Sequence, residues 1–401
     1  MGASASGFPL SGGAQGGRQG KTGGIMSAES YFLYHSIGQY PGKARDIAGA
    51  MAEFAVTWAS PDDGQWGQVL GRRQRFIDLW RRILRAAPGS VTTFENVTSA
   101  LHGMLTALPA GHLRGRVVLV AADCFPSNHF LLQGMAATHG FALRTVALRQ
   151  GSAHVEDEDF MAAWGPEVGV ALLTWVSSTT SHRIDLRRMV AHGRRMGSLI
   201  GVDITQGAGL LPFDVHAPEV DFAVSTSLKW MCGTPGAGML YLSPRLIAHC
   251  QPQLRGWFSQ DNPFNWDITR FSYAGDMRRF DNGTPSVMAA LASLPAMEWH
   301  AGQDMPALLA HNRALTRLII AAADRMGLDL ITPRDPDKRG GSVMLRLPKR
   351  LVAAEVVAAL RTHGITTDAR GQVLRLSPGV MTTAAGVERL VDALGRLLRP
   401  R

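Results

Sequence analysis

The chain has 401 residues and a formal net charge of +9, with 46% hydrophobic and 18% charged residues. This composition is typical of a globular protein with a large core and excludes a chain that is disordered throughout. No run of about 18 apolar residues occurs, so no membrane partner is expected. The three cysteines form no CxxC pair, which favours neither a disulfide scaffold nor a metal site and fits a cytoplasmic location.

The positive charge comes almost entirely from arginine. Only five of the 41 basic residues are lysines, and Lys229 is the only lysine between residues 44 and 337. Lysine, unlike arginine, can lose its proton and form a Schiff base, so a lone lysine in an apolar stretch suggests covalent chemistry. The densest basic run, residues 72–85, predicts an amphipathic helix with a solvated basic face, and we expect no nucleic-acid partner.

The first 30 residues differ from the rest of the chain. Nine of the first 24 residues are glycine, no acidic residue precedes Glu29, and no periodicity is present. Residues 1–30 therefore predict a flexible tail, within which Met26 is a candidate start. The GGRQGKT stretch lacks the first glycine of a phosphate-binding P-loop and follows no apolar strand, so that motif is excluded.

Short apolar segments then alternate with helical segments such as residues 186–196. The segments expected to form strands are 116–122, 142–148, 168–176, 199–203 and 222–225. Strands that are apolar on both faces and separated by helices predict an α/β fold with a mostly parallel sheet. Ligands of such sheets bind beyond the carboxyl ends of the strands.

The same pattern predicts two domains. Residues 61–295 form the large domain, and residues 296–401 form a smaller α+β domain with strands at 342–347 and 372–376. Residues 31–60 are expected to pack on the small domain.

A carboxylate and the lone lysine lie at the ends of successive expected strands. Asp203 ends the segment LIGVD, and Lys229 follows in STSLKW, just before a glycine-rich turn. Pyridoxal phosphate needs such a lysine to hold it and such a carboxylate to keep its ring nitrogen protonated. It also needs a helix N-terminus for its phosphate, which residues 97–99 would supply, and an aromatic side chain such as Phe125 for its ring.

With these motifs the chain resembles fold-type-I pyridoxal-phosphate enzymes of the class V aminotransferase group, and it is most similar to kynureninase from about Tyr31 to the C-terminus. Its ENVTSAL segment resembles the phosphate loop of that family, and CFPSNH resembles the segment whose phenylalanine stacks on the ring. The resemblance implies that the cofactor contacts come from these residues: Val97, Thr98, Phe125, Asn128, Thr174, Asp203, Gln206, Thr226 and Lys229.

Other segments resemble the family's subunit interface and substrate site. LRGWFSQ and RRFDNGTPS imply that Trp257 and Thr284 reach the cofactor of a neighbouring subunit, hence a homodimer. RLSP implies that Arg375 binds the substrate carboxylate. The opening segment YFLYHSIGQYP implies substrate contacts from His35 and Ser36.

The chain departs from kynureninases at positions that would surround an aryl ketone. Leu228 replaces a tyrosine, Gln206 and Gln260 replace histidines, and Asn128 stands where aspartate is usual. Ser178 and Ser181 occupy positions that are aromatic and glycine in the family. Cofactor binding is therefore better supported than hydrolysis of kynurenine.

The sequence leaves several reactions open. We expect an enzyme that acts on an α-amino acid by elimination, substitution or C–C bond chemistry in specialised metabolism. The alternatives are kynureninase-type hydrolysis, transamination, epimerisation and cysteine desulfuration. Desulfuration is disfavoured because Cys124 and Cys232 look like buried small residues. The alternative outside catalysis is an inactive binding protein on the same fold.

Overall fold

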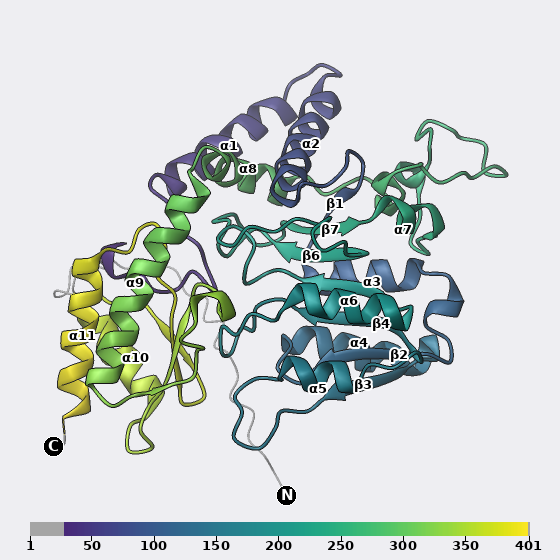
Figure 1. Ribbon diagram of the computed structural model, residues 1–401. Helices are drawn as coiled ribbons and strands as arrows, with labels where there is room; N and C mark the ends of the chain where they lie inside the picture. The colour runs from purple at the N-terminus through teal and green to yellow at the C-terminus, as the bar shows by residue number, and fades with distance from the viewer. Residues whose placement is uncertain (1–27, 400–401) are drawn as a thin grey trace, which may run out of the picture.

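The computed structural model describes residues 28–399, which form a large and a small domain, each built on one sheet (Figure 1). The large sheet has the strand order β1-β7-β6-β5-β4-β2-β3, and within the described residues β7 alone runs antiparallel to its neighbours. Its strands are β1 (Val91–Phe94), β2 (Val117–Ala121), β3 (Ala142–Val146), β4 (Val168–Thr174), β5 (Leu199–Asp203), β6 (Phe222–Thr226) and β7 (Gly238–Leu242). The five expected strands correspond to β2–β6, which confirms the α/β fold.

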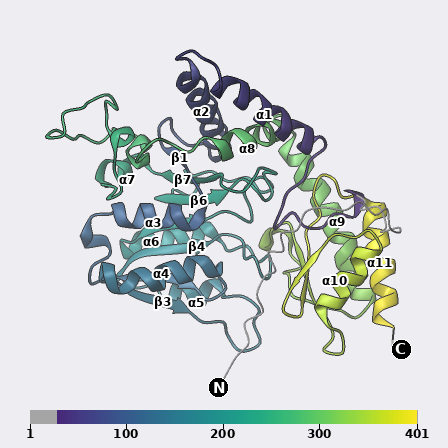
Figure 2. The same ribbon diagram turned by 180° about the vertical axis from the view of Figure 1, so that it is seen from behind.

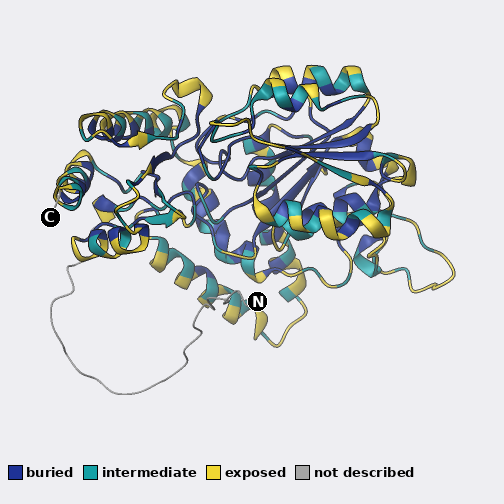
Figure 3. Ribbon diagram, turned by 90° about the horizontal axis from the view of Figure 1, so that it is seen from below, coloured by how far each residue is buried: buried dark blue, intermediate teal, exposed yellow. Residues whose placement is uncertain are grey.

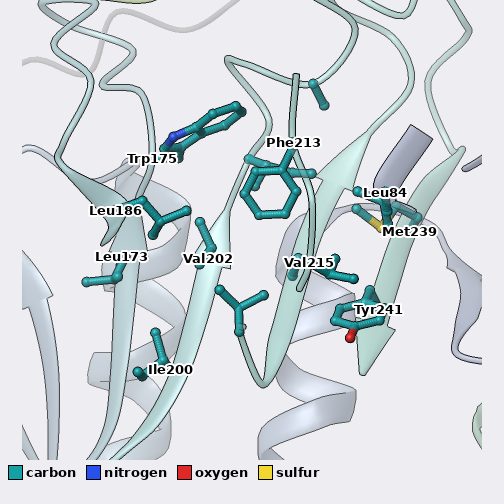
Figure 4. Packing of buried hydrophobic residues seen from close by; sticks show 14 of the residues in the cluster. Leu84, Leu173, Trp175, Leu186, Ile200, Val202, Phe213, Val215, Met239 and Tyr241 are labelled. Atoms are coloured by element: carbon teal, nitrogen blue, oxygen red, sulfur yellow. The ribbon is translucent and has the colours of Figure 1, made fainter. Parts of the chain in front are cut away.

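Helices cover both faces of this sheet. In β2, Leu119 packs into one core cluster and its neighbours Val118 and Val120 pack into the other, as the two-residue period of a strand requires. The first face carries α2 (Gln65–Leu84), α5 (Asp157–Ala162), α6 (Leu186–Met196) and α8 (Met288–Ala301); the second carries α3 (Val97–Ala107), α4 (Pro126–His139) and α7 (Pro244–His249). Figure 3 shows the strands as a buried layer, and Figure 4 shows Val202, Phe213 and Met239 in the first core.

Helix α2 contains the basic run that was expected to have a solvated face. Phe76, Leu79 and Trp80 are buried, as the helical spacing predicts. One arginine of that run corrects the prediction, because Arg73 is itself buried. Its Nη2 atom donates a hydrogen bond of 2.7 Å to Oδ1 of Asp281, which is also buried. An ion pair of this kind compensates for the removal of both charges from water.

The small domain, which carries the labels α9, α10 and α11 in Figure 2, has an antiparallel sheet with the strand order β10-β11-β9-β8. Its elements are α9 (Met305–Arg325), β8 (Asp329–Leu330), β9 (Val343–Arg346), α10 (Ala353–Thr362), β10 (Asp368–Arg370), β11 (Val373–Leu376) and α11 (Ala384–Leu398). The two expected strands match β9 and β11. Apolar side chains of α9, α10 and α11 close a separate core against one face of this sheet.

The N-terminal segment contacts both domains. Residues 28–30, which were expected to belong to the flexible tail, form a short 3₁₀ helix with Ser30 buried, while residues 1–27 lie outside the described part. Tyr31 and Leu33 pair with Thr366 and Ser377 of the small domain. The following helix α1 (Lys43–Trp58) instead packs on α8 and α2. The domain boundary that we placed after residue 295 lies inside α8.

A long irregular segment connects α7 to α8. Residues 251–287 contain only two 3₁₀ helices, Trp257–Ser259 and Met277–Phe280, and part of this segment extends away from the large domain (Figure 1). No helix within residues 28–399 is long and apolar enough to cross a membrane.

Candidate active site

A cavity of about 440 Å³ opens where β4, β5 and β6 end, beside the N-terminus of α3. This is the edge of the sheet at which ligands of α/β proteins bind. The side chains around it are mostly hydroxyl or apolar groups. Those lining it are Glu95, Asn96, Val97, Thr98, Phe125, Ser127, Thr174, Val176, Ser178, Asp203, Thr205, Gln206, Thr226, Leu228, Lys229, Pro235 and Gly236.

The cavity contains the lone lysine, as the sequence predicts. Lys229 follows β6, and its Nζ lies 5.3 Å from the centre of the Phe125 ring. Burial lowers the pKa of Lys229, the charge of Asp203 opposes that effect, and Arg375 and Arg370 lower the pKa further, to about 8. An ordinary lysine has a pKa of 10.5. About a tenth of the amine is therefore unprotonated, and hence nucleophilic, at pH 7, far more than for an ordinary lysine.

The loop that carries Lys229 is held by close backbone packing. The amide of Gly38 donates a hydrogen bond of 2.9 Å to the carbonyl oxygen of Leu228. A Cβ atom on Gly38 would lie 1.8 Å from the carbonyl oxygen of Lys229, so only glycine allows this approach. Cys232 has a φ of 60°, a left-handed conformation that turns the chain back toward β7. The N-terminal segment thus fixes the position of the lysine.

Asp203 is held by two hydrogen bonds at the end of β5. Its Oδ1 accepts the amide of Thr205 at 3.0 Å, and its Oδ2 accepts Nδ2 of Asn128 at 2.9 Å. The side-chain oxygen Oδ1 of Asn128 and the hydroxyls of Thr174 and Thr205 are buried and have no hydrogen-bond partner among the described residues. Buried polar atoms without partners usually mark a place where another molecule binds.

The N-terminus of α3 provides an anion-binding site. The side chain of Asn96 caps this helix by accepting the amide of Ser99 at 2.9 Å, and Oγ of Ser99 accepts the amide of Asn96 at 3.1 Å. The first amides of the helix, at Val97 and Thr98, have no acceptor inside it. Both residues line the cavity, so these amides and the helix dipole favour a phosphate there.

Arg375 lies in a buried polar cluster on the small domain. Its Nε donates to Oδ1 of Asp368 at 2.8 Å, and its Nη2 bonds to Oδ2. His35 joins the cluster, with Nε2 3.0 Å from Asp368 and Nδ1 2.6 Å from Oγ of Ser377. Burial alone would raise the pKa of Asp368, but His35 and Arg375 outweigh that effect and lower it to about 2. Burial lowers the pKa of His35 to about 4, so its imidazole is neutral.

Several predicted site residues lie outside the cavity. Both ring nitrogens of His35 are engaged, and the backbone amide of Ser36 bonds to Leu33, so substrate contacts by these residues stay predictions. Thr284 lines a larger groove of about 1420 Å³, and Trp257 stacks on Trp266. Within one chain neither residue reaches the cavity that holds Lys229. Their expected role in a neighbouring subunit also stays a prediction.

The positions that depart from the resemblance are placed as follows. Leu228 and Ser178 line the cavity, whereas Gln260 bonds to Asn265 elsewhere. The amide group of Gln206 donates to the carbonyl oxygen of His35 at 3.0 Å. Ser181 has a φ of 63°, which explains why glycine would suit that position.

Sequence reasoning missed several functional residues. Glu95, Ser127, Val176, Thr205 and Gly236 line the cavity without having been predicted. Asp368 was also missed as the partner of Arg375. A hairpin signal could have revealed it, because the segment DARGQVLR turns at Gly371 and pairs Asp368 directly opposite Arg375.

The arrangement fits pyridoxal phosphate. The unpartnered polar atoms near Asp203, the ring of Phe125 beside Lys229 and the free amides of α3 match the donors and surfaces that the group requires. Burial raises the pKa of Cys124, Cys232 and Cys250 to about 12, so none of the three is a reactive thiolate at neutral pH.

Known sequences resemble this chain over most of its length. The profile of the family described as "Aminotransferase class-V" matches residues 81–390. A kynureninase of Deinococcus radiodurans is 32% identical over 76% of this chain and 73% of its own length. A kynureninase of Monosiga brevicollis is 27% identical over 92% and 88%. An isopenicillin N epimerase of Streptomyces clavuligerus is 28% identical over 79% and 82%.

Solved structures share the fold at lower identity. A cysteine desulfurase of Thermococcus onnurineus has a TM-score of 0.80 and 16% identity, covering 92% of this chain and 94% of that chain. The lyase C-DES, in a mutant form with glycine covalently linked to its PLP cofactor, has a TM-score of 0.81 and 18% identity, covering 92% and 96%.

Proposed function

Because the chain belongs to the aminotransferase class-V family and its cofactor is pyridoxal 5′-phosphate, we propose that it catalyses bond chemistry at an α-amino acid other than kynurenine. The reaction classes proposed are β- or γ-elimination, substitution and C–C bond cleavage or formation. One observation carries the proposal: Lys229 and Asp203 share a cavity, and Leu228 lines it at a position where the sequence resemblance to kynureninases implies a tyrosine.

Each residue of the cavity has a defined task in this proposal. Pyridoxal phosphate, when bound, withdraws electrons from the α-carbon of an amino acid. Lys229 holds the cofactor and then removes or returns the α-proton at its Nζ. Asp203, fixed by Asn128, keeps a proton on the ring nitrogen. Val97 and Thr98 bind the phosphate through the N-terminus of α3, and Phe125 covers the ring.

Hydrolysis of kynurenine is disfavoured by the same geometry. The isobutyl group of Leu228 cannot donate a proton, and the amide of Gln206 does not change charge near neutral pH as histidine does. Loss of one general acid costs about 10²–10⁴-fold in rate. Epimerisation is the second candidate because one relative is an isopenicillin N epimerase, and this reaction needs only removal and return of the α-proton.

A homodimer is part of the proposal. The large groove shares Glu95, Asn96, Thr98 and Gly236 with the cofactor cavity, so a second copy seated there would reach the site. The irregular segment exposes large apolar side chains that suit an interface, namely Leu254, Phe264, Trp266 and Ile268. Light scattering tests the assembly, and an active monomer would contradict it. Mixing Lys229→Ala and Trp257→Ala chains should restore part of the activity if sites are shared.

The experiment that tests the function is a screen of amino acids against the holoenzyme. Changes in the visible absorption of the cofactor report binding, and mass spectrometry identifies products. L-Kynurenine and 3-hydroxykynurenine are included, with anthranilate or hydroxyanthranilate release as the readout. Turnover of kynurenine at about 1–10³ s⁻¹ would contradict the proposal and show that the protein acts as a kynureninase. A purified protein with no visible cofactor absorption would instead favour an inactive binding protein.

A further inference from the structure

A second arginine faces the active site from the small domain. Arg370 ends β10, two residues after Asp368, so both side chains lie on the same face of that strand. Nη1 of Arg370 donates a hydrogen bond of 3.3 Å to Oγ of Ser178. Ser178 lines the cavity that holds Lys229, so this contact places the Arg370 guanidinium at the edge of that cavity.

The charge of Asp368 acts on Arg370, but the two side chains form no ion pair. Asp368 is engaged by Arg375 through both carboxylate oxygens, and Arg370 forms no ion pair with any residue of the described range 28–399. The segment before residue 28 contains no aspartate or glutamate, so it has no acidic side chain to offer. The bond to Ser178 uses one of the five N–H donors of a guanidinium. Within residues 28–399 the remaining donors form no other hydrogen bond, so they are open to an anion.

The contact between the two domains at this point is firmly held. The loop of residues 177–182 carries Ser178, and three small-domain groups bind it. The hydroxyl of Thr332 donates to the Thr180 carbonyl at 2.8 Å, and the amides of Gly340 and Ser342 donate to Ser181 at 2.7 and 3.2 Å. Arg370 and Ser178 are therefore kept at a fixed separation, as a preorganised binding site requires.

The cavity presents both polar and apolar groups to a substrate. Among residues 28–399, Phe125 is the only aromatic residue that lines it, and that ring lies beside Lys229. Hydroxyl groups of Ser127, Ser178 and Thr205 also line it. The positive charges of Arg375 and Arg370 are both near enough to lower the pKa of Lys229.

We propose that Arg370 and Ser178 form a subsite for an acidic group on the substrate side chain. The substrate is then an α-amino acid with a second acid group, whose α-carboxylate binds Arg375 while the distal acid binds Arg370. This inference rests on the proposed function, since it assumes that amino acids bind beside Lys229. The proposal specifies the class of substrate on which the proposed reaction acts.

Isosteric amino acids provide the test. The holoenzyme is titrated with L-glutamate against L-glutamine and with L-aspartate against L-asparagine, and binding is followed by cofactor absorption and independently by calorimetry. The acid of one pair should bind about 10- to 100-fold more tightly than its amide, the range expected for hydrogen bonds to a charged group. Arg370→Gln should remove this preference and leave the affinity for the amide within about twofold, because only the charged partner is lost.

Two further variants sharpen the result. Arg370→Lys keeps the charge and should restore part of the preference, although it loses the fork geometry of arginine. Arg361→Gln, which removes an exposed arginine from α10, should leave both affinities unchanged. Equal binding of acids and amides by the wild-type protein, or an unchanged preference in Arg370→Gln, would overturn the subsite alone. Failure of every amino acid to bind would overturn the proposed function together with the subsite.

Discussion

The pKa of Lys229 results from opposing effects within one cavity. Burial and the two arginines of the small domain lower it, and Asp203 raises it, with a result of about 8. Burial thus destabilises the charged form of the amine, whereas the carboxylate of Asp203 stabilises it. This pKa supports the proposed role of Lys229, in which its amine binds the cofactor aldehyde near neutral pH and exchanges a proton with the substrate.

The rate at which the unloaded protein captures its cofactor should rise with pH and level off above about pH 8. The reason is that only the unprotonated amine of Lys229 attacks, and its pKa is about 8 rather than 10.5. Stopped-flow absorbance measures this rate. Lys229→Ala should abolish both the colour and trapping by borohydride, whereas Lys349→Ala, at an exposed position, should change neither. A plateau only above pH 10 would contradict the assignment.

Asp203→Asn should preserve phosphate binding and abolish most α-proton exchange. The amide has the same shape but cannot keep the ring nitrogen protonated, so the electron sink is weakened. We expect a loss of at least about 10²-fold in exchange rate, at the lower end of what general acid–base groups contribute. Deuterium exchange into a bound amino acid, followed by NMR, measures it. Exchange at the wild-type rate would show that another group serves the ring.

Arg375→Lys should weaken substrate binding and leave cofactor absorption unchanged. Asp368 occupies the Nε and Nη2 side of the guanidinium, which leaves its Nη1 side for the substrate carboxylate. Lysine cannot serve both partners in this geometry. We expect the apparent substrate constant to rise about tenfold or more, which corresponds to loss of about one charged hydrogen bond. An unchanged constant would place the carboxylate site elsewhere.

The central elements could be predicted from the sequence because they are long and apolar on both faces. The segment 199–203 coincides with β5, and residues 186–196 coincide with α6, which Asp185 caps and Gly197 ends. The short edge strands β1, β8 and β10 were missed, since two to four residues with polar side chains give little periodicity. Their positions depend on pairing with distant strands.

Site prediction shows the same division. Asp203, which ends β5, and Lys229, which follows β6, could be predicted from their positions after apolar segments of the sequence. Residues that reach the site by tertiary packing could not, because Asp368 and Arg370 belong to a short edge strand more than 100 residues away in sequence. The close contact between Gly38 and the loop that carries Lys229 could not be predicted for the same reason.

Gly38→Ala should destabilise the protein and weaken cofactor retention together. The added methyl group would overlap the Lys229 carbonyl oxygen and the Cys232 side chain. Overpacking of this kind costs about 1–3 kcal/mol. Denaturant unfolding and dialysis of the bound cofactor measure the two effects. Gly49→Ala is the matched control, because no atom lies near its added Cβ in α1 and helix propensity favours alanine by about 0.5–1 kcal/mol.

The folded protein should lose stability as the pH falls from about 6.5 to 4. Burial lowers the pKa of His35 to about 4, and burial together with His154 and Lys338 lowers that of His182 to about 4. In that range the unfolded chain binds protons that the native protein excludes. Each histidine then contributes up to about 1.4 kcal/mol per pH unit.

Denaturant unfolding at several pH values between 4 and 7 measures this slope. His182→Gln should reduce the slope by about one proton, because it removes one buried imidazole whose pKa is lowered. His249→Gln, at an exposed position of α7, should leave the slope unchanged. If the free energy of unfolding stays constant from pH 6.5 to 4, the two histidines bind protons in the native protein as readily as in the unfolded chain.

The contacts of the N-terminal segment also set an order of events during synthesis. Gly38 secures the lysine loop, but the segment that carries it is itself paired with residues 366 and 377. A chain still emerging from the ribosome can fold β2–β7 early, since domains fold as units from the N-terminus. Its reactive lysine nevertheless lacks this support until the last tenth of the chain has been made. Stable loading with the cofactor is therefore a step that follows translation.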